Sequence, residues 1–344
     1  MGKYHIQDWG LHDWISIEYT PMSIVNTPAY YLYAQVVSRT AGMLGRTEES
    51  IRYAKLAEEI RGSYNGKFLD PVTGIYGVSG STAKMERWWD KSRPEDVHET
   101  WWTGKRPCTQ AGQVLPLALG LVPEDVRSKA ESALVREIAA HSNRVSTGFV
   151  ATPYLLELLA DLAPGAGYDM TSTMDYPSWY SMTAGASGVS RQASDHDLMQ
   201  EGWSGRPVMM PSLGGNIAGW HMYSLGGIRC DPSAPGYKKI IIKPNMVGDL
   251  HWVESWYESV HGRIISNWRK RGAQCVMDIT IPANMTATVY VPGSDPDRIT
   301  ESGKQASRAL CVKFLRMDKG CAVYEVGAGR YIFSMQVTHE AKRR

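Results

Sequence analysis

The segment Asp231-Pro232-Ser233-Ala234-Pro235-Gly236 divides this 344-residue chain into two parts with different apolar patterns. Before it, apolar residues recur mostly at the spacing of α-helices. After it, short β-branched runs are bounded by turn residues, as in Tyr237 to Lys243, where three isoleucines lie between lysines. The pattern therefore predicts a mainly α region followed by an all-β region, with one domain over residues 1–232 and a second over 233–344.

The expected helices are separated by loops and do not alternate with strands, which is typical of an all-α toroid or bundle. Thr27-Pro28 predicts a cap followed by proline at the first helical position, and Pro123-Glu124-Asp125 predicts another helix start. The expected helices cover 28–44, 47–60, 113–121, 124–138, 152–159 and 214–225. The expected strands of an antiparallel sandwich cover 237–243, 276–281, 287–291, 324–326 and 331–337.

Composition excludes several classes of protein. Lys plus Arg is 37 and Asp plus Glu is 35, so the net charge of +2 argues against nucleic acid as a partner. The chain has no apolar run long enough to span a membrane, and its five cysteines form no CxxC pair. We therefore expect no membrane partner and no cofactor. No cluster of His and Asp has convincing ligand spacing, so we expect no metal ligand set, and a Ca²⁺ site at Asp195-His196-Asp197 is the alternative. The chain contains 12 Trp and 18 Tyr residues but 4 Phe residues. This composition favours either concave sites where sugars stack or a large aromatic core.

Several motifs occur in order along the chain: Thr27-Pro28-Ala29-Tyr30-Tyr31-Leu32-Tyr33, Leu44-Gly45-Arg46, Tyr53-Ala54-Lys55-Leu56-Ala57, Phe68-Leu69-Asp70, Leu117 to Glu124, Tyr176-Pro177-Ser178-Trp179, Pro235 to Lys238 and Ile281 to Ala287. In order and spacing they resemble the bacterial α-L-rhamnosidases of glycoside hydrolase family 78. The resemblance covers most of the chain. It implies a partial (α/α)6 toroid of the six-hairpin glycosidase type, followed by a C-terminal antiparallel β-sandwich.

The same resemblance implies that more of the toroid lies upstream of Met1, because the expected helices are too few to close it. The family's general acid is expected in that upstream part. Any export signal would also lie there, so a periplasmic or extracellular location is expected for the full-length protein, and a cytoplasmic one stays open. The expected partner is a rhamnose-containing oligosaccharide or polysaccharide.

The family's general base is a glutamate that follows the Tyr-Pro-Ser-Trp motif, and this chain departs from that pattern. The corresponding stretch reads Gly185-Ala186-Ser187-Gly188-Val189-Ser190-Arg191, so that Arg191 stands at the glutamate position. A guanidinium stays protonated and cannot activate water. Glu201, close to Trp203, is a candidate replacement base, and a solvated loop carboxylate is the alternative.

Two further groups contain candidate sugar-binding residues. The first is the Trp-rich stretch with His98, Trp101, Trp102, Lys105 and Arg106, which is either a rim of the sugar site or a loop folded onto the core. The second comprises Asp13 and Trp14, which resemble a family segment beside the sugar. The alternative is that Asp13 is a helix cap and Trp14 is a core residue. Trp179 and Trp220 complete the candidates for the pocket wall.

Three functions remain open from the sequence. Hydrolysis of terminal α-L-rhamnosyl bonds comes first, with Glu201 as base. The alternative is a rhamnose-α-1,4-glucuronate lyase acting by β-elimination, in which Arg191 would neutralise the uronate and His98 is one of the candidate bases. A carbohydrate-binding protein without catalysis is the third.

Overall fold

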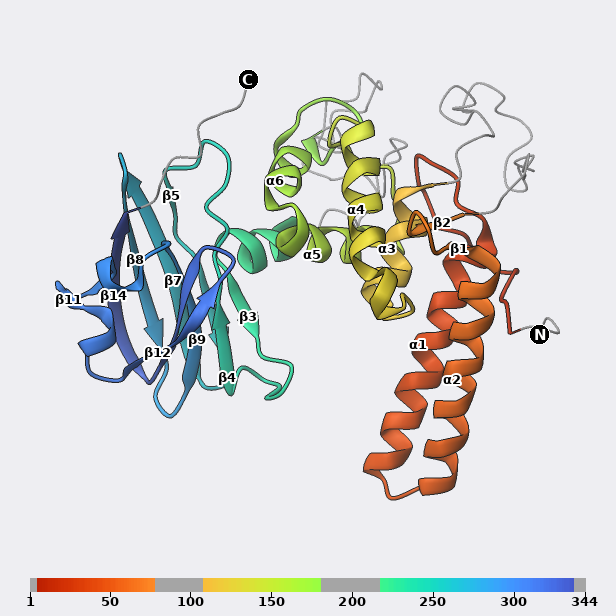
Figure 1. Cartoon of the computed structure of the whole chain (residues 1–344), viewed down its shortest axis with the longest axis horizontal. Helices are drawn as coiled ribbons and strands as arrows, with labels where there is room; N and C mark the ends of the chain where they lie inside the picture. The colour runs from red at the N-terminus through yellow and green to blue at the C-terminus, as the bar shows by residue number, and fades with distance from the viewer. Residues whose placement is uncertain (1–4, 78–107, 181–216, 337–344) are drawn as a thin grey trace, which may run out of the picture. The chain divides into compact units, whose positions relative to one another are not determined.

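The computed structural model describes residues 5–77, 108–180 and 217–336. Contacts group the chain into two compact units, Met1–Ile217 and Ala218–Arg344. The described parts of the first unit are mainly helical, and those of the second form two β-sheets (Figure 1). The predicted order of a helical region followed by a β-rich region is confirmed. The described helices include none that is both long and apolar enough to cross a membrane.

Helices α1–α6 and one short hairpin build the first unit. Their bounds are α1 Met22–Met43, α2 Thr47–Phe68, β1 Leu69–Asp70, β2 Ile75–Tyr76, α3 Gln110–Leu119, α4 Glu124–Ala140, α5 Thr152–Leu162 and α6 Pro164–Ser172. Helices α1 and α2 lie side by side and are joined by a short turn (Figure 1). Helix α3 contacts α1, α4 and α5, and α5 contacts α6. Helix α3 is therefore the element around which the described helices of this unit pack.

Helix α1 begins earlier than the sequence analysis predicted. It starts at Met22, and Pro28 lies inside it rather than at its first position. Proline has no N–H, so it cannot donate to the carbonyl oxygen four residues earlier. That oxygen belongs to Ile24, and it accepts a 3.1 Å hydrogen bond from the hydroxyl of Tyr64 on α2. A partner on the neighbouring helix therefore satisfies the group that Pro28 leaves open.

Helix α2 continues to Phe68, beyond its predicted end at residue 60, and two further helices depart from the prediction. Helix α3 begins at Gln110 because the side chain of Thr109 accepts the Gly112 N–H at 3.0 Å and caps it. Helix α6 was not predicted at all, since it is short and its sequence is rich in glycine and polar residues. Packing against α5 stabilises it where intrinsic propensity does not.

The second unit contains two sheets that enclose one core. One sheet has the strand order β11-β10-β14-β8-β7-β5, with β6 also paired to β7, and the other has the order β12-β13-β9-β4-β3. The strand bounds are β3 Ile228–Cys230, β4 Lys239–Ile242, β5 Trp252–Val253, β6 Trp256–Ser259, β7 Gly262–Arg271, β8 Gln274–Ile281, β9 Thr286–Pro292, β10 Thr300–Glu301, β11 Lys304–Gln305, β12 Val312–Asp318, β13 Cys321–Val326 and β14 Gly329–Gln336.

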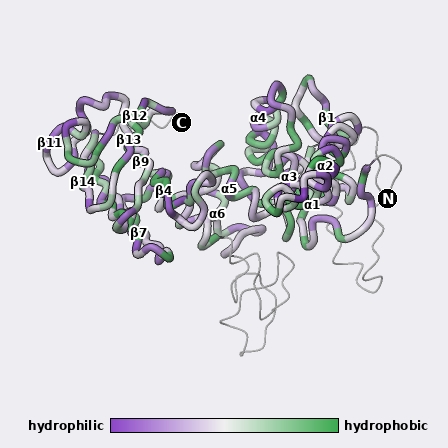
Figure 2. Tube along the Cα trace, turned by 90° about the horizontal axis from the view of Figure 1, so that it is seen from below, coloured by the Kyte–Doolittle hydropathy of each residue, from purple (hydrophilic) through white to green (hydrophobic). Residues whose placement is uncertain are grey.

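The predicted sandwich is confirmed in its main features. Buried side chains of both sheets form one hydrophobic core, among them Trp268, Phe333 and Val289. Buried and less buried residues alternate along β8, and the tube in Figure 2 shows hydrophobic residues along the strands of this unit. The described strand pairs of this unit are antiparallel except β4 and β9, which pair in parallel. The strands β7 and β12 were not predicted, because their charged residues interrupt the apolar signal.

A short turn of π-helix, His221–Leu225, packs onto β7 within the second unit. The indole N–H of Trp268 donates to the carbonyl oxygen of Leu225 at 2.8 Å, and the hydroxyl of Ser266 donates to Gly226 at 2.6 Å. These bonds satisfy backbone groups at the end of the turn. The predicted domain division after residue 232 stays a prediction.

Candidate functional site

The carboxylate of Asp13 organises the segment that precedes helix α5. One oxygen accepts the backbone N–H of Gly148 at 2.7 Å, and the other accepts those of Val150 and Ala151 at 2.9 and 3.1 Å. Ala151 is the residue before the first turn of α5, where free N–H groups and the helix dipole favour an anion. Burial raises the pKa of Asp13 from 3.8 to about 6, although the three backbone N–H bonds act in the opposite direction. The described contacts thus give Asp13 a structural role.

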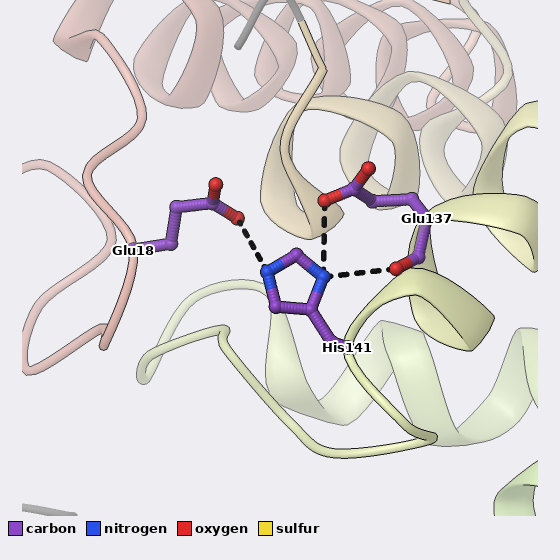
Figure 3. A group of neighbouring side chains, drawn as sticks. All are labelled: Glu18, Glu137 and His141. Carbon is purple, nitrogen blue, oxygen red and sulfur yellow. Dashed lines mark hydrogen bonds and ion pairs between the residues drawn. The ribbon is translucent and has the colours of Figure 1, made fainter. Parts of the chain in front are cut away.

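A second group contains the buried Glu18 and Glu137 and the half-buried His141, which Figure 3 shows pointing toward one another. Glu18 comes from the segment before α1, Glu137 from the last turn of α4, and His141 directly follows α4. The Nδ1 atom of His141 lies 2.9 Å from the backbone carbonyl oxygen of Glu137 and 3.2 Å from its carboxylate. The Nε2 atom lies 3.9 Å from the carboxylate of Glu18. A carbonyl oxygen can only accept, so Nδ1 carries a proton.

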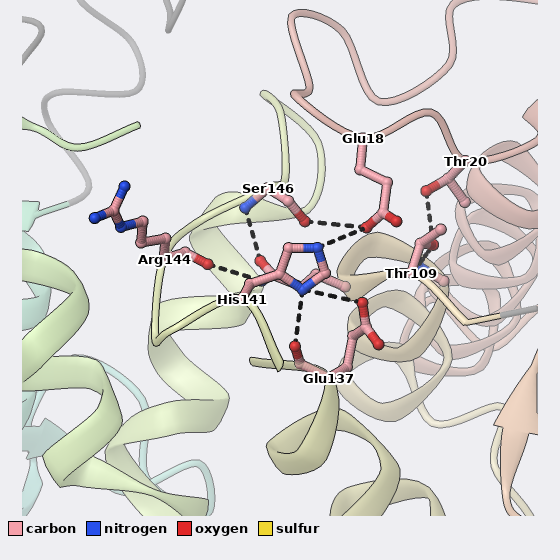
Figure 4. Close-up of polar contacts among 9 residues, drawn as sticks. Glu18, Thr20, Thr109, Glu137, His141, Arg144 and Ser146 are labelled. Carbon is pink, nitrogen blue, oxygen red and sulfur yellow. Dashed lines mark hydrogen bonds and ion pairs between the residues drawn. The ribbon is translucent and has the colours of Figure 1, made fainter. Parts of the chain in front are cut away.

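Hydrogen bonds extend this group toward α3 and the loop after α4 (Figure 4). The hydroxyl of Ser146 donates to Glu18 at 3.3 Å, and the backbone N–H of Ser146 donates to the side chain of Gln110 at 2.8 Å. The hydroxyls of Thr20 and Thr109 lie 2.8 Å apart. The network therefore connects the segment before α1 to three elements that are distant in sequence, and it holds the polar interior of this unit in one arrangement.

The group of Glu18, Glu137 and His141 offers one ligand atom per residue, and these atoms all lie within 4.8 Å of one another. Carboxylate and imidazole together are a ligand set for zinc and related ions. Nδ1 is held by the Glu137 carbonyl oxygen, so Nε2 is the ring atom that could reach an ion. The expectation of no metal ligand set rested on spacing in the sequence and stays a prediction.

The two carboxylates of this group do not form the pair that inverting glycoside hydrolysis uses. Such carboxyl groups lie roughly 6.5–9.5 Å apart, with a water molecule between them. Here the carboxylate oxygens approach within 4.8 Å, and the ring of His141 contacts both side chains. The arrangement is a polar network in which His141 bridges the segment before α1 and the end of α4.

Comparison with protein-family models identifies both parts of the chain. Residues 2–190 match the bacterial α-L-rhamnosidase six-hairpin glycosidase domain, and residues 227–306 match the bacterial α-L-rhamnosidase C-terminal domain. The first match covers more than half of the chain. The chain belongs to the bacterial α-L-rhamnosidase six-hairpin glycosidase family.

Curated relatives of this six-hairpin glycosidase chain are themselves named α-L-rhamnosidases. One from Streptomyces avermitilis is 26% identical over 333 residues, which are 95% of this chain and 28% of the relative. One from an Alteromonas species is 26% identical over 283 residues, covering 79% of this chain and 27% of the relative. The chain thus spans less than a third of the length of these relatives.

Solved structures share the fold of this six-hairpin glycosidase chain. The crystal structure of the Streptomyces avermitilis α-L-rhamnosidase complexed with L-rhamnose aligns with a TM-score of 0.74 at 24% identity, covering 97% of this chain and 29% of that one. The α-L-rhamnosidase from Dictyoglumus thermophilum aligns with a TM-score of 0.75 at 23% identity, covering 97% and 35%. These alignments confirm the predicted fold class.

The structure describes four of the candidate site residues of the glycosidase chain. Asp13 lies at α5 as described above, and the backbone carbonyl oxygen of the neighbouring Trp14 accepts the Phe149 N–H at 2.9 Å. Trp179 is buried in the first unit, and Trp220 is buried in the second. The indole of Trp220 lies edge-on to the ring of His221, and burial lowers the pKa of that histidine. Their roles in sugar binding stay predictions.

The remaining candidates lie outside the described residues. They are His98, Trp101, Trp102, Lys105, Arg106, Arg191, Glu201 and Trp203. In contrast, the network of Glu18, Glu137 and His141 was not predicted. The spacing of four between Glu137 and His141 places both on one face of a helix and was a visible signal, but nothing in the sequence connects them to Glu18.

Proposed function

We propose that this chain takes part in the hydrolysis of terminal α-L-rhamnosyl bonds in plant or microbial glycans. The observation that carries the proposal is the ordered match of both family models, supported by a fold shared with a rhamnosidase that was crystallised with L-rhamnose. The relatives named α-L-rhamnosidase are longer than this chain, so the activity of the whole protein is part of the proposal.

Hydrolysis needs a base that takes a proton from water and an acid that protonates the departing oxygen. Water attacks the anomeric carbon of rhamnose, the bond from that carbon to the aglycone oxygen breaks, and this oxygen takes up the proton. Glu201 is the residue that we assign as base. The buried pair of Glu18 and Glu137 is not assigned to either role, because His141 already contacts both carboxylates.

A second candidate function rests on Arg191, which stands where the family pattern has its glutamate base. In β-elimination at a uronic acid carrying rhamnose, a base removes the proton at C5, and a cation stabilises the charge that develops on the carboxylate. The bond from C4 to the rhamnosyl oxygen then breaks, C4 and C5 become doubly bonded, and the oxygen takes up a proton and leaves as free rhamnose. Arg191 would provide that cation, and His98 is a candidate base. Binding of the glycan without catalysis is the third possibility.

One substrate separates these functions. A rhamnose-capped glucuronate glycan is incubated with the protein, and released rhamnose and ultraviolet absorbance are both measured. Hydrolysis releases rhamnose without absorbance, and elimination produces an unsaturated uronate that absorbs. Rhamnose without absorbance is the expected result. Absorbance would replace the hydrolase with the lyase, and binding of the glycan without either product would leave the non-catalytic role.

A further inference from the structure

The outer face of the seven-stranded sheet carries a groove whose lining belongs entirely to the second unit. Its volume is about 390 Å³, and its lining residues come from β7, from β8 and β5 on either side of it, and from the residue after β5. Pockets that bind small molecules begin at roughly 300 Å³. The groove is therefore large enough for a small polar ligand, and it is separate from the buried network in the first unit.

Strand alternation explains why polar side chains line this groove. Along β7, Ile264, Ser266 and Trp268 are buried, so the residues between them face outward. Those outward residues include Asn267, Arg269 and Arg271. On β8 they lie opposite Asp278, Val276 and Gln274, in that order. Hydrogen-bonding side chains thus lie on both strands of this face, with the apolar Val276 between those of β8.

Trp252 provides an aromatic wall beside these side chains. It lies on β5 opposite Arg269 and leaves 57% of its surface exposed. The flat amphipathic ring of an exposed indole suits the C–H face of a sugar. Trp256 on β6 has a similar exposure of 59% but does not line the groove.

Two amide side chains are fixed by bonds that leave half of each amide available to a ligand. The Oδ1 atom of Asn267 accepts the backbone N–H of Ser255 at 3.0 Å, so the amide N–H groups are the available part. The Nε2 atom of Gln274 donates to the hydroxyl of Ser334 at 3.0 Å, so the carbonyl oxygen is available. Recognition of a sugar hydroxyl requires a donor and an acceptor that other hydrogen bonds hold in position.

The charges in the groove favour an anion. Arg330 holds both oxygens of Asp278 at 2.9 and 2.7 Å, which neutralises that carboxylate. Arg269 lies 4.0 Å from Glu254, its counterion. Arg271 has no ion pair among the residues that the structure describes, so one guanidinium is available. A guanidinium binds carboxylates in a two-pronged geometry.

We infer that this groove binds a short oligosaccharide containing a uronic acid, with a sugar ring against Trp252 and the uronate carboxylate on Arg271. The choice of a glycan as occupant rests on the proposed function. The groove is argued from its described lining residues alone, which all lie on the second unit.

The test is isothermal titration of the full chain with rhamnosyl-glucuronate and with rhamnosyl-glucose, which differ only at the carboxylate. We expect the uronate to bind more tightly. Trp252→Ala should weaken binding about tenfold, as truncation of an aromatic anchor does, and the matched control Trp256→Ala should stay within twofold. Arg271→Gln should abolish the preference for the uronate, whereas Arg263→Gln, on the same strand outside the groove, should preserve it.

The inference would be overturned by equal affinity of the unsubstituted chain for the two saccharides, by no binding of either, or by equal losses in the two tryptophan variants. Circular dichroism verifies that each variant is folded, and all four substitutions are at exposed positions. The readout for the groove is the change in uronate binding caused by Trp252→Ala and Arg271→Gln, and neither residue is a candidate catalytic residue. A chain whose uronate binding falls in these variants but which releases no rhamnose retains the groove and loses the proposed hydrolysis. A chain that releases rhamnose and binds the uronate equally well in both variants loses only the groove.

Discussion

The carboxylate of Asp13 lies 2.7 Å from the backbone nitrogen of Gly148, a residue 135 positions later in the chain. A Cβ on Gly148 would lie 2.2 Å from the backbone oxygen of Trp14 and 2.7 Å from that of Asp13. The two segments therefore approach so closely that only glycine fits. This contact aligns the N-terminal segment with the start of α5, and it also determines where Glu18 lies relative to α4.

Substitution of Gly148 tests this close approach. Gly148→Ala should lower the free energy of unfolding by about 3 kcal/mol, because the neighbouring atoms are backbone and cannot rotate away. Gly165→Ala on α6 is the control, since a Cβ there meets no atom within 4 Å. It should be neutral or slightly stabilising. Equal effects of the two substitutions in urea unfolding would contradict the close approach.

Asp13 should make stability depend on pH. Its folded pKa of about 6 exceeds the reference value of 3.8, so the folded state binds the proton more tightly. The contribution of this proton binding to the unfolding free energy is complete below about pH 4. It disappears as pH rises through 6, a change of about 3 kcal/mol. The difference in unfolding free energy between the unsubstituted chain and Asp13→Asn should fall over that range. A difference in unfolding free energy that does not change with pH would refute this prediction. Carbon-detected NMR titration of Asp13 provides a second measurement.

The network around His141 should contribute to folding. His141→Ala leaves two buried carboxylates without the ring between them, and we expect a loss of about 3 kcal/mol in unfolding free energy. His141→Asn places a donor near the Nδ1 position and should recover part of the loss. The control is His251→Ala at an exposed position, with a change within about 0.5 kcal/mol. If His141→Ala lost no more unfolding free energy than the control, the network would not contribute to stability.

Glu201 and Arg191 should separate the two chemistries. Glu201→Gln should lower kcat for rhamnoside hydrolysis by about 10²-fold or more, as removal of a general base does. Asp195→Asn, in the same acidic segment, should leave the rate unchanged. Arg191→Ala should spare hydrolysis and abolish any elimination. An unchanged rate in Glu201→Gln removes that residue from the mechanism, and loss of hydrolysis in Arg191→Ala would contradict the assignment of that arginine to elimination alone.

Several elements were predictable because their signals are local. The caps and apolar stripes predicted α2 and α4 close to their observed starts at Thr47 and Glu124. The β-branched run at 239–242 and the alternation in β8 predicted strands. Helix α1 was predicted with the wrong start, since Pro28 is tolerated inside it only through a hydroxyl on α2.

Unlike these helices and strands, the candidate sites are formed by contacts between residues that are far apart in the sequence. The sequence by itself determined the order of a helical part and a β part and the family motifs, since both are read from neighbouring residues. The exchange that would place Arg191 at the base position stays a prediction from the sequence. Only the tertiary structure brought Glu18 to His141, Asp13 to Gly148, and Trp252 to a row of side chains on β7 and β8. Such contacts depend on how distant segments pack, and the spacing of residues in the sequence does not reveal that packing.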